Sequence, residues 1–167
     1  IATKAIRESY VARLMGDFRS VKGLKVAWDA GNGALGPAMT QLTSCLPGVH
    51  ILLNAEVNGD FPAHHPDPTI PENLIQLQEI VRKEKCDLGI AFDGDGDRIG
   101  VVDGLGRILW GDQILAILAR DMLEELPGAT IIADVKASQA LFDEVIRLGG
   151  HPVMSPTGHS VIKSKMA

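Results

Sequence analysis

Three carboxylates stand on alternate residues of one short segment, two glycines separate them, and an arginine closes the run: Asp93, Asp95, Asp97 and Arg98. The apolar runs on either side, Leu88–Phe92 and Ile99–Val102, predict buried strands. The acids therefore fall at a strand end, where open α/β sheets usually place their ligand sites.

This spacing favours a site for a hard divalent cation. Glycine adopts backbone angles that other residues avoid, so Gly94 and Gly96 allow the loop to curl and bring the carboxylates together. Crowded carboxylates repel one another unless a positive charge lies between them. Mg²⁺ prefers oxygen ligands in octahedral geometry and commonly keeps positions for water and for a substrate phosphate. The segment thus predicts Mg²⁺ ligation by the aspartates, with the guanidinium of Arg98 holding a phosphate oxygen.

A solvated turn and a calcium EF-hand are two other interpretations of the acidic run. Asp and Gly are common turn residues, but strict alternation, the closing arginine and the apolar flanks favour the metal site over a solvated turn. The EF-hand requires glycine at the sixth loop position and glutamate at the twelfth, where this chain has Arg98 and Gly104, so it is excluded.

Strand and helix patterns alternate along the chain, which predicts an α/β fold. The expected strands cover residues 24–29, 49–53, 88–92, 99–102, 129–134 and 152–154. The expected helices cover residues 3–18, 37–46, 112–126 and 138–148, with another starting at 160. A further helix is expected to begin with capping-box spacing at Thr69 and Glu72 and to run to about Lys85. A turn at Gly104–Gly106 then separates residues 1–106 from a second unit, residues 107–167.

A glycine-rich turn after the first strand has the spacing of a dinucleotide-binding fingerprint. Gly31, Gly33 and Gly36 precede a helix, and Glu56 follows 20 residues after the third glycine. Pro37 suits the first turn of a helix, which would start later than a dinucleotide-binding helix does. The pattern favours a structural turn, with a dinucleotide-binding module as the alternative.

The proline-rich segment from Asn54 to Pro71 carries two histidines and an aspartate, His64, His65 and Asp67. These types bind metals, but adjacent side chains rarely converge on one ion, and the surrounding prolines stiffen the backbone. A rigid connector is the preferred interpretation.

Composition narrows the class of protein. The chain has 167 residues, 46% hydrophobic and 22% charged, as expected for a globular protein with a real core. A formal net charge of −5 and 4% aromatic residues argue against nucleic acid as a partner. No apolar run is long enough to predict a membrane span or a secretory signal. The two cysteines, Cys45 and Cys86, do not suggest a disulfide framework, so we expect a reduced, cytoplasmic setting.

Together, the motifs resemble those of the α-D-phosphohexomutases, and most closely the bacterial phosphomannomutase/phosphoglucomutase group. The matching segments occur in the family's order: HHPDPTIPENL (64–74), FDGDGDR (92–98), ADVKAS (133–138) and PTGHSVIKSKM (156–166).

The resemblance implies an isomerase of four domains, the first three built on a mixed-sheet α/β architecture. Residues 1–106 resemble the second, metal-binding domain, and residues 107–167 resemble a partial second copy of that architecture, the start of the third domain. The implied reaction is a Mg²⁺-dependent phosphoryl transfer between the 1- and 6-positions of glucose or mannose phosphates. It proceeds through a hexose 1,6-bisphosphate intermediate and a phosphoserine that lies outside this chain.

The resemblance also assigns roles to individual residues. Asp93, Asp95 and Asp97 match the magnesium ligands, and Arg98 matches a residue that contacts phosphate beside the metal. Two further matches approach the sugar and its reacting hydroxyl, Lys136 and His159. A histidine suits proton transfer and a lysine suits electrostatic stabilisation.

Several family elements are missing from the sequence, including the Ser-His-Asn-Pro phosphoserine loop, the Glu-x-x-Ser-Gly-His sugar loop and the fourth domain. We therefore expect a piece of a longer polypeptide, inactive alone, whose partners are hexose phosphate and the remaining domains. The sugar preference stays open. A haloacid-dehalogenase-type phosphatase, with Asp93 as nucleophile and Asp95 as acid, is another alternative. That class normally has Thr or Val two residues past the second acid, where Asp97 or Arg98 stands here.

Overall fold

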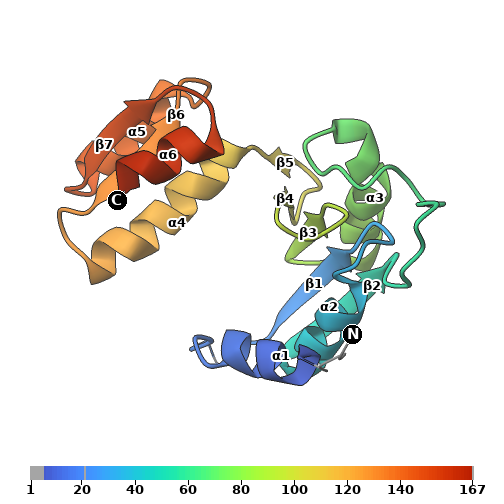
Figure 1. Ribbon diagram of the computed structural model, residues 1–167. Helices are drawn as coiled ribbons and strands as arrows, with labels where there is room; N and C mark the ends of the chain where they lie inside the picture. Colours follow the sequence, from blue (N-terminus) through green and yellow to red (C-terminus); the bar gives the residue numbers. More distant parts are fainter. Residues whose placement is uncertain (1–5, 21, 167) are drawn as a thin grey trace, which may run out of the picture. The chain divides into compact units, whose positions relative to one another are not determined.

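The computed structural model describes residues 6–20 and 22–166. The chain divides into two compact units, residues 1–108 and 109–167 (Figure 1). Each unit is built from alternating strands and helices, which confirms the α/β class predicted from the sequence.

The larger unit is built on a mixed five-stranded sheet in the order β2-β1-β3-β4-β5. Its strands are β1 (Leu24–Asp29), β2 (Gly48–Leu53), β3 (Leu88–Phe92), β4 (Ile99–Asp103) and β5 (Ile108–Leu109). β1 runs parallel to β2 and β3, whereas β4 runs antiparallel to β3. The carboxyl ends of the parallel strands β1 and β3 therefore lie at the same end of the sheet. Asp29 is the last residue of β1, and Asp93 directly follows β3.

Helices cover both faces of this sheet. They are α1 (Arg7–Met15), α2 (Gly36–Cys45), the 3₁₀ turn η1 (Pro71–Leu74) and α3 (Ile75–Glu84). Because strand side chains alternate between faces, Trp28 of β1 joins a core with Met39 of α2, and Ala27 joins a second core with Leu77 and Val81 of α3. Packing on both faces fixes the register of the strands whose ends carry the acids.

The acidic segment is the connection of an antiparallel hairpin. Phe92 pairs with Ile99, so the strand ladder holds both ends of the loop that contains the aspartates. The loop curls through Gly96, whose φ of 79° lies in the left-handed region and whose N–H donates to the Asp93 carbonyl oxygen at 3.1 Å.

Two helix starts differ from expectation. The expected helix 3–18 is observed as Arg7–Met15, and residues 3–5 lie outside the described part of the chain. The expected capping box at Thr69 and Glu72 is wrong. The Thr69 hydroxyl donates to Asp67 at 2.7 Å, and the following helix starts as the η1 turn without a side-chain cap. The nearby carboxylate of Asp67 accepts the hydroxyl that a capping box would have used.

The smaller unit contains α4 (Gly111–Glu125), β6 (Thr130–Asp134), α5 (Gln139–Arg147), β7 (His151–Ser155) and α6 (His159–Met166). β6 and β7 are parallel. Its core joins α4, β6 and α5, through residues that include Leu123, Ile131 and Phe142. Both cysteines are free thiols. No helix within the described residues is both long and apolar enough to cross a membrane.

We expect Leu77→Ala to destabilise the larger unit by about 2–5 kcal/mol, because it removes a fully buried side chain and leaves a cavity between α3 and the sheet. Urea unfolding of the full chain, followed by circular dichroism, measures the loss. Ile75→Ala on the same helix is the control, since Ile75 is 51% exposed and its loss should stay within about 0.5 kcal/mol. Equal losses for both variants would contradict the packing described here.

Candidate functional site

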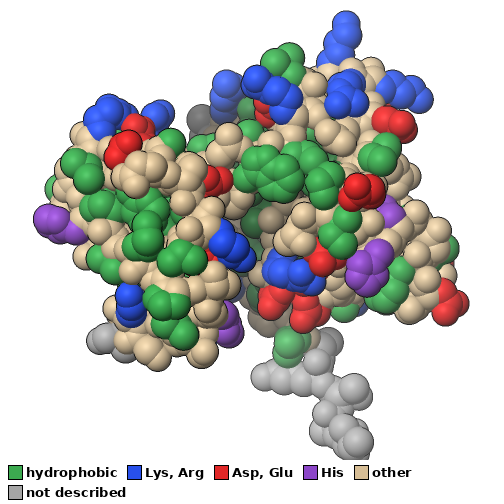
Figure 2. Space-filling view, turned by 90° about the horizontal axis from the view of Figure 1, so that it is seen from above, with side chains coloured by type: hydrophobic (Ala, Val, Ile, Leu, Met, Phe, Trp, Pro, Cys, Tyr) green, Lys and Arg blue, Asp and Glu red, His purple; other side chains and the backbone are tan. Residues whose placement is uncertain are grey.

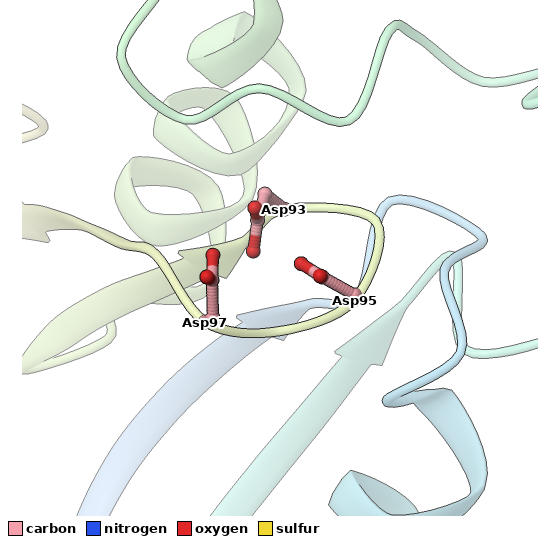
Figure 3. A group of neighbouring side chains, drawn as sticks. All are labelled: Asp93, Asp95 and Asp97. Carbon is pink, nitrogen blue, oxygen red and sulfur yellow. The ribbon is translucent and has the colours of Figure 1, made fainter.

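The three aspartates of the hairpin loop point toward a shared centre (Figure 3). Asp93, Asp95 and Asp97 each offer a carboxylate oxygen, and these oxygens all lie within 4.8 Å of one another. Asp93 is buried at the strand end, and the other two are exposed. Acidic and basic side chains lie side by side on the surface of this unit (Figure 2). The loop therefore gathers three carboxylates at one point while leaving an open side toward solvent.

Arg98 holds the buried end of this cluster. Its backbone N–H donates to one carboxylate oxygen of Asp93 at 3.0 Å, and its Nε donates to the other at 2.8 Å. Its Nη1 also donates to Asp67 at 3.1 Å. Burial alone would raise the pKa of Asp93, but the hydrogen bonds and charge of Arg98 lower that pKa to about 2. Asp93 is thus ionised and fixed in orientation.

The crowding of the carboxylates changes the pKa of Asp97. The negative charge of Asp95, followed by the hydrogen bond and charge of Asp93, raises the pKa of Asp97. A cation among these oxygens would reverse that effect. Carboxylate oxygens are the donors that Mg²⁺ prefers, so the residues present fit a magnesium ion. Within the described part of the chain, one group of three acids, histidines or cysteines has ligand atoms close enough together to hold a metal ion. It consists of Asp93, Asp95 and Asp97.

The glycine-rich turn after β1 packs against the backbone of the acidic loop. The Ala34 N–H donates to the Gly94 carbonyl oxygen at 2.8 Å, and a Cβ at Gly33 would lie only 2.5 Å from that oxygen. A Cβ at Gly36 would lie 2.0 Å from the Ala55 carbonyl oxygen. The space beside Gly33 and Gly36 is thus filled by protein backbone and is not open to a pyrophosphate. The structural turn explains why both positions are glycine.

Sequence reasoning missed a buried ion pair next to this site. Asp29 is fully buried at the end of β1, and His64 Nε2 lies 2.8 Å from its carboxylate. The hydrogen bond to Asp29 raises the pKa of His64 above its ordinary value, against the opposing effect of burial. The sequence signal for this pair was the position of Asp29 at the end of an expected strand. The structure pairs that strand in parallel with the one that leads to Asp93.

The smaller unit presents the other two expected site residues on neighbouring loops. Lys136 follows β6, and His159 begins α6 just after β7; both are exposed. Asp134 ties the two loops together, because it accepts hydrogen bonds from the Lys136 backbone at 2.9 Å and from the Thr157 hydroxyl at 3.1 Å. The structure thus places Lys136 and His159 at the same end of a parallel strand pair.

Comparison with known proteins identifies the family of this chain. Residues 8–106 match the family described as phosphoglucomutase/phosphomannomutase, alpha/beta/alpha domain II, and residues 110–167 match its domain III. The chain belongs to the phosphoglucomutase/phosphomannomutase family. The phosphatase and dinucleotide-binding alternatives find no support in these matches.

Individual relatives support the assignment. A phosphomannomutase/phosphoglucomutase of Pseudomonas aeruginosa is 47% identical over 157 residues, which are 94% of this chain and 34% of that protein. The crystal structure of a phosphoglucomutase/phosphomannomutase family protein from Burkholderia thailandensis is 42% identical with a TM-score of 0.92, covering 96% of this chain and 35% of that one. The chain therefore spans about a third of the length of these relatives.

A more distant match shares the fold alone. It is the structure of Aspergillus fumigatus N-acetylphosphoglucosamine mutase in complex with GlcNAc-6P and magnesium, 21% identical with a TM-score of 0.64. The match covers 95% of this chain and 33% of that one.

We expect the Asp29–His64 pair to make stability depend on pH. Because the folded-state pKa of His64 is raised above 6.5, the pair contributes fully below about pH 6.5 and its contribution is lost as pH rises through the raised pKa. The charged and polar groups in contact with the ring are the Asp29 carboxylate, the Asn54 amide and the His65 carbonyl. Urea unfolding above pH 6.5 should show a fall in stability for the wild type and a smaller fall for His64→Gln.

His151→Gln is the matched control for this pH series. His151 is exposed at the start of β7 in the smaller unit, and its replacement should leave the wild-type pH dependence of unfolding in place. Parallel curves for the wild type and His64→Gln would refute the assignment to the buried pair.

Proposed function

We propose that this chain supplies the metal-binding and part of the sugar-binding machinery of a phosphohexomutase, an isomerase that moves a phosphoryl group between the 1- and 6-positions of a hexose phosphate. The observation that carries the proposal is the convergence of Asp93, Asp95 and Asp97, in a chain that belongs to the phosphoglucomutase/phosphomannomutase family.

In this proposal the three aspartates hold Mg²⁺ on the open side of the hairpin loop. When bound, Mg²⁺ neutralises charge on a phosphoryl group and leaves room for a phosphate oxygen as a further ligand. Asp93 is already ionised and oriented by Arg98, so the site needs little rearrangement to accept the ion. The Arg98 side chain remains 50% exposed, which allows its guanidinium to reach a phosphate beside the metal.

Lys136 and His159 would act on the sugar. Lys136 is 73% exposed, and its Nζ lies 3.6 Å from the Asp134 carboxylate, so its side chain is free to turn toward a substrate oxygen. His159 stands exposed at the first residue of α6, where its imidazole can take up or release a proton of a reacting hydroxyl.

The remaining parts of the reaction belong to other segments of a longer polypeptide. We infer that residues 1–106 and 107–167 act as successive domains between an earlier domain with the phosphoserine and a later phosphate-binding domain. A hexose 1,6-bisphosphate would form and reorient during the cycle. The choice between glucose and mannose phosphates depends on a loop beyond this chain, and the cytoplasmic setting stays a prediction.

Metal binding tests the site directly. We expect the full 167-residue chain to bind Mg²⁺, and Asp95→Asn to weaken binding at least about ten-fold, because it replaces a charged ligand by a neutral one. Isothermal titration measures both affinities. Asp121→Asn on α4 is the matched control, since it makes the same change of charge at an exposed position of the smaller unit and should bind like the wild type. Identical binding by wild type and Asp95→Asn would overturn the ligand assignment.

Activity tests the wider proposal. The isolated chain should not interconvert glucose 1-phosphate and glucose 6-phosphate, because it contains no Ser-His-Asn-Pro loop to carry the phosphoryl group. The full-length protein that contains this chain should catalyse the interconversion with Mg²⁺, and Asp95→Asn should abolish it. A coupled assay for glucose 6-phosphate measures both. Turnover by the isolated chain, or none by the full-length protein with either glucose or mannose phosphates, would contradict the proposal.

A further inference from the structure

The proline-rich segment around His64 makes an unbroken series of contacts with the acidic loop. We propose that the buried Asp29–His64 pair is a positioning device for the metal loop, acting through residues 64–68. This inference rests on the metal site proposed above, and it assigns a role to a segment that the sequence analysis treated only as a connector.

The first link is the anchoring of His64. Asp29 has no exposed surface, and its carboxylate takes part in three interactions. Oδ1 accepts hydrogen bonds from the Gly31 N–H and the Asn54 amide, each at 2.9 Å, while Oδ2 lies 2.8 Å from His64 Nε2. Of these partners, His64 is the one that can carry a positive charge. The ring is also fixed at its other nitrogen, which lies 3.0 Å from the His65 carbonyl oxygen.

The second link is packing by two prolines that follow His64. Pro66 is buried between two glycines of different loops: a Cβ at Gly31 would lie 3.0 Å from Pro66 Cβ, and a Cβ at Gly94 would lie 3.5 Å from Pro66 Cγ. Pro68 is buried against β4, where a Cβ at Gly100 would lie 2.8 Å from Pro68 Cβ. The rigid rings therefore transmit the position of residue 64 to the backbone at Gly94, between the first two aspartates, and at Gly100, after the third.

The third link is polar. Asp67 accepts a hydrogen bond from Arg98 Nη1 at 3.1 Å, and Arg98 Nε donates to the buried carboxylate of Asp93 at 2.8 Å. The Asp67 carboxylate is itself held by the backbone N–H and the hydroxyl of Thr69. Three residues after His64, the segment thus reaches the arginine that orients the first metal ligand.

Loss of the His64 imidazole would disturb each contact in this series. A fully buried carboxylate that loses its cationic partner is strongly destabilised, so the surrounding loops must shift to admit water or another donor. Any such shift moves Pro66 and Asp67, and with them Gly94 and Arg98. Partners that orient metal ligands without touching the ion commonly change metal affinity by about 10–100-fold when they are removed.

The experiment measures Mn²⁺ binding to the full chain by electron paramagnetic resonance of the free ion, at pH 6.5, with folding checked by circular dichroism. We expect His64→Ala to weaken Mn²⁺ affinity about ten-fold, and Asp67→Asn to weaken it by a similar factor. If His64 acts through Asp67, the double variant should bind about as weakly as the weaker single variant, so the two effects should not multiply.

Two further variants separate positioning from general stability. His64→Gln places an amide nitrogen near the site of Nε2 and should restore part of the affinity, and it replaces His64→Ala if that variant fails to fold. Val81→Ala removes volume from the core between α3 and the sheet, so it should lower stability while Mn²⁺ affinity stays at the wild-type value.

Wild-type Mn²⁺ affinity in folded His64→Ala, or in His64→Gln if only that variant folds, would overturn the positioning role. So would effects of His64→Ala and Asp67→Asn that multiply fully. If Asp95→Asn still loses binding in the same series, the metal site itself stands. Wild-type affinity in Asp95→Asn would instead remove the proposed metal site and this inference with it.

Discussion

Mutual repulsion among three carboxylates is the constraint around which the larger unit is organised. The loop from Asp93 to Asp97 brings their oxygens within 4.8 Å of one another, and the negative charges of Asp95 and Asp93 raise the pKa of Asp97. The fold compensates at the buried end, where Arg98 neutralises Asp93, and leaves the exposed end to be neutralised by a cation. This asymmetry supports the proposal that the loop receives a metal ion and a phosphate, rather than forming a solvated turn.

The contacts that hold the acidic loop in place are made mostly by backbone groups and a proline ring. The hairpin ladder between β3 and β4 fixes the two ends of the loop, and the glycine-rich turn approaches it closely enough to donate a hydrogen bond to Gly94. Pro66 packs against both Gly31 of that turn and Gly94 of the loop. Such contacts carry no charge of their own, so they hold the acids in place without neutralising them.

The smaller unit uses the same device at the ends of its own parallel strands. Asp134 ends β6 as Asp29 ends β1, and in both cases the carboxylate accepts hydrogen bonds from the loops that follow the strands. In the larger unit the carboxylate is buried and pairs with an imidazole, whereas Asp134 is partly exposed and leaves Lys136 and His159 open to solvent. The two units thus place the acidic loop, in one, and Lys136 and His159, in the other, at the ends of parallel strands.

The sequence by itself determined the α/β class and the strands that flank the acidic loop, because these depend on local period and on the identity of neighbouring residues. Only the tertiary structure decided what Asp29, His64 and Asp67 do, since their partners lie up to 35 positions away along the chain and meet only when β1 and β3 pair. The failed capping box at Thr69 has a local cause instead, because the Thr69 hydroxyl donates to Asp67, two residues before it. Local pattern specifies what a residue can bind, and the packing of distant segments decides which of those partners it meets.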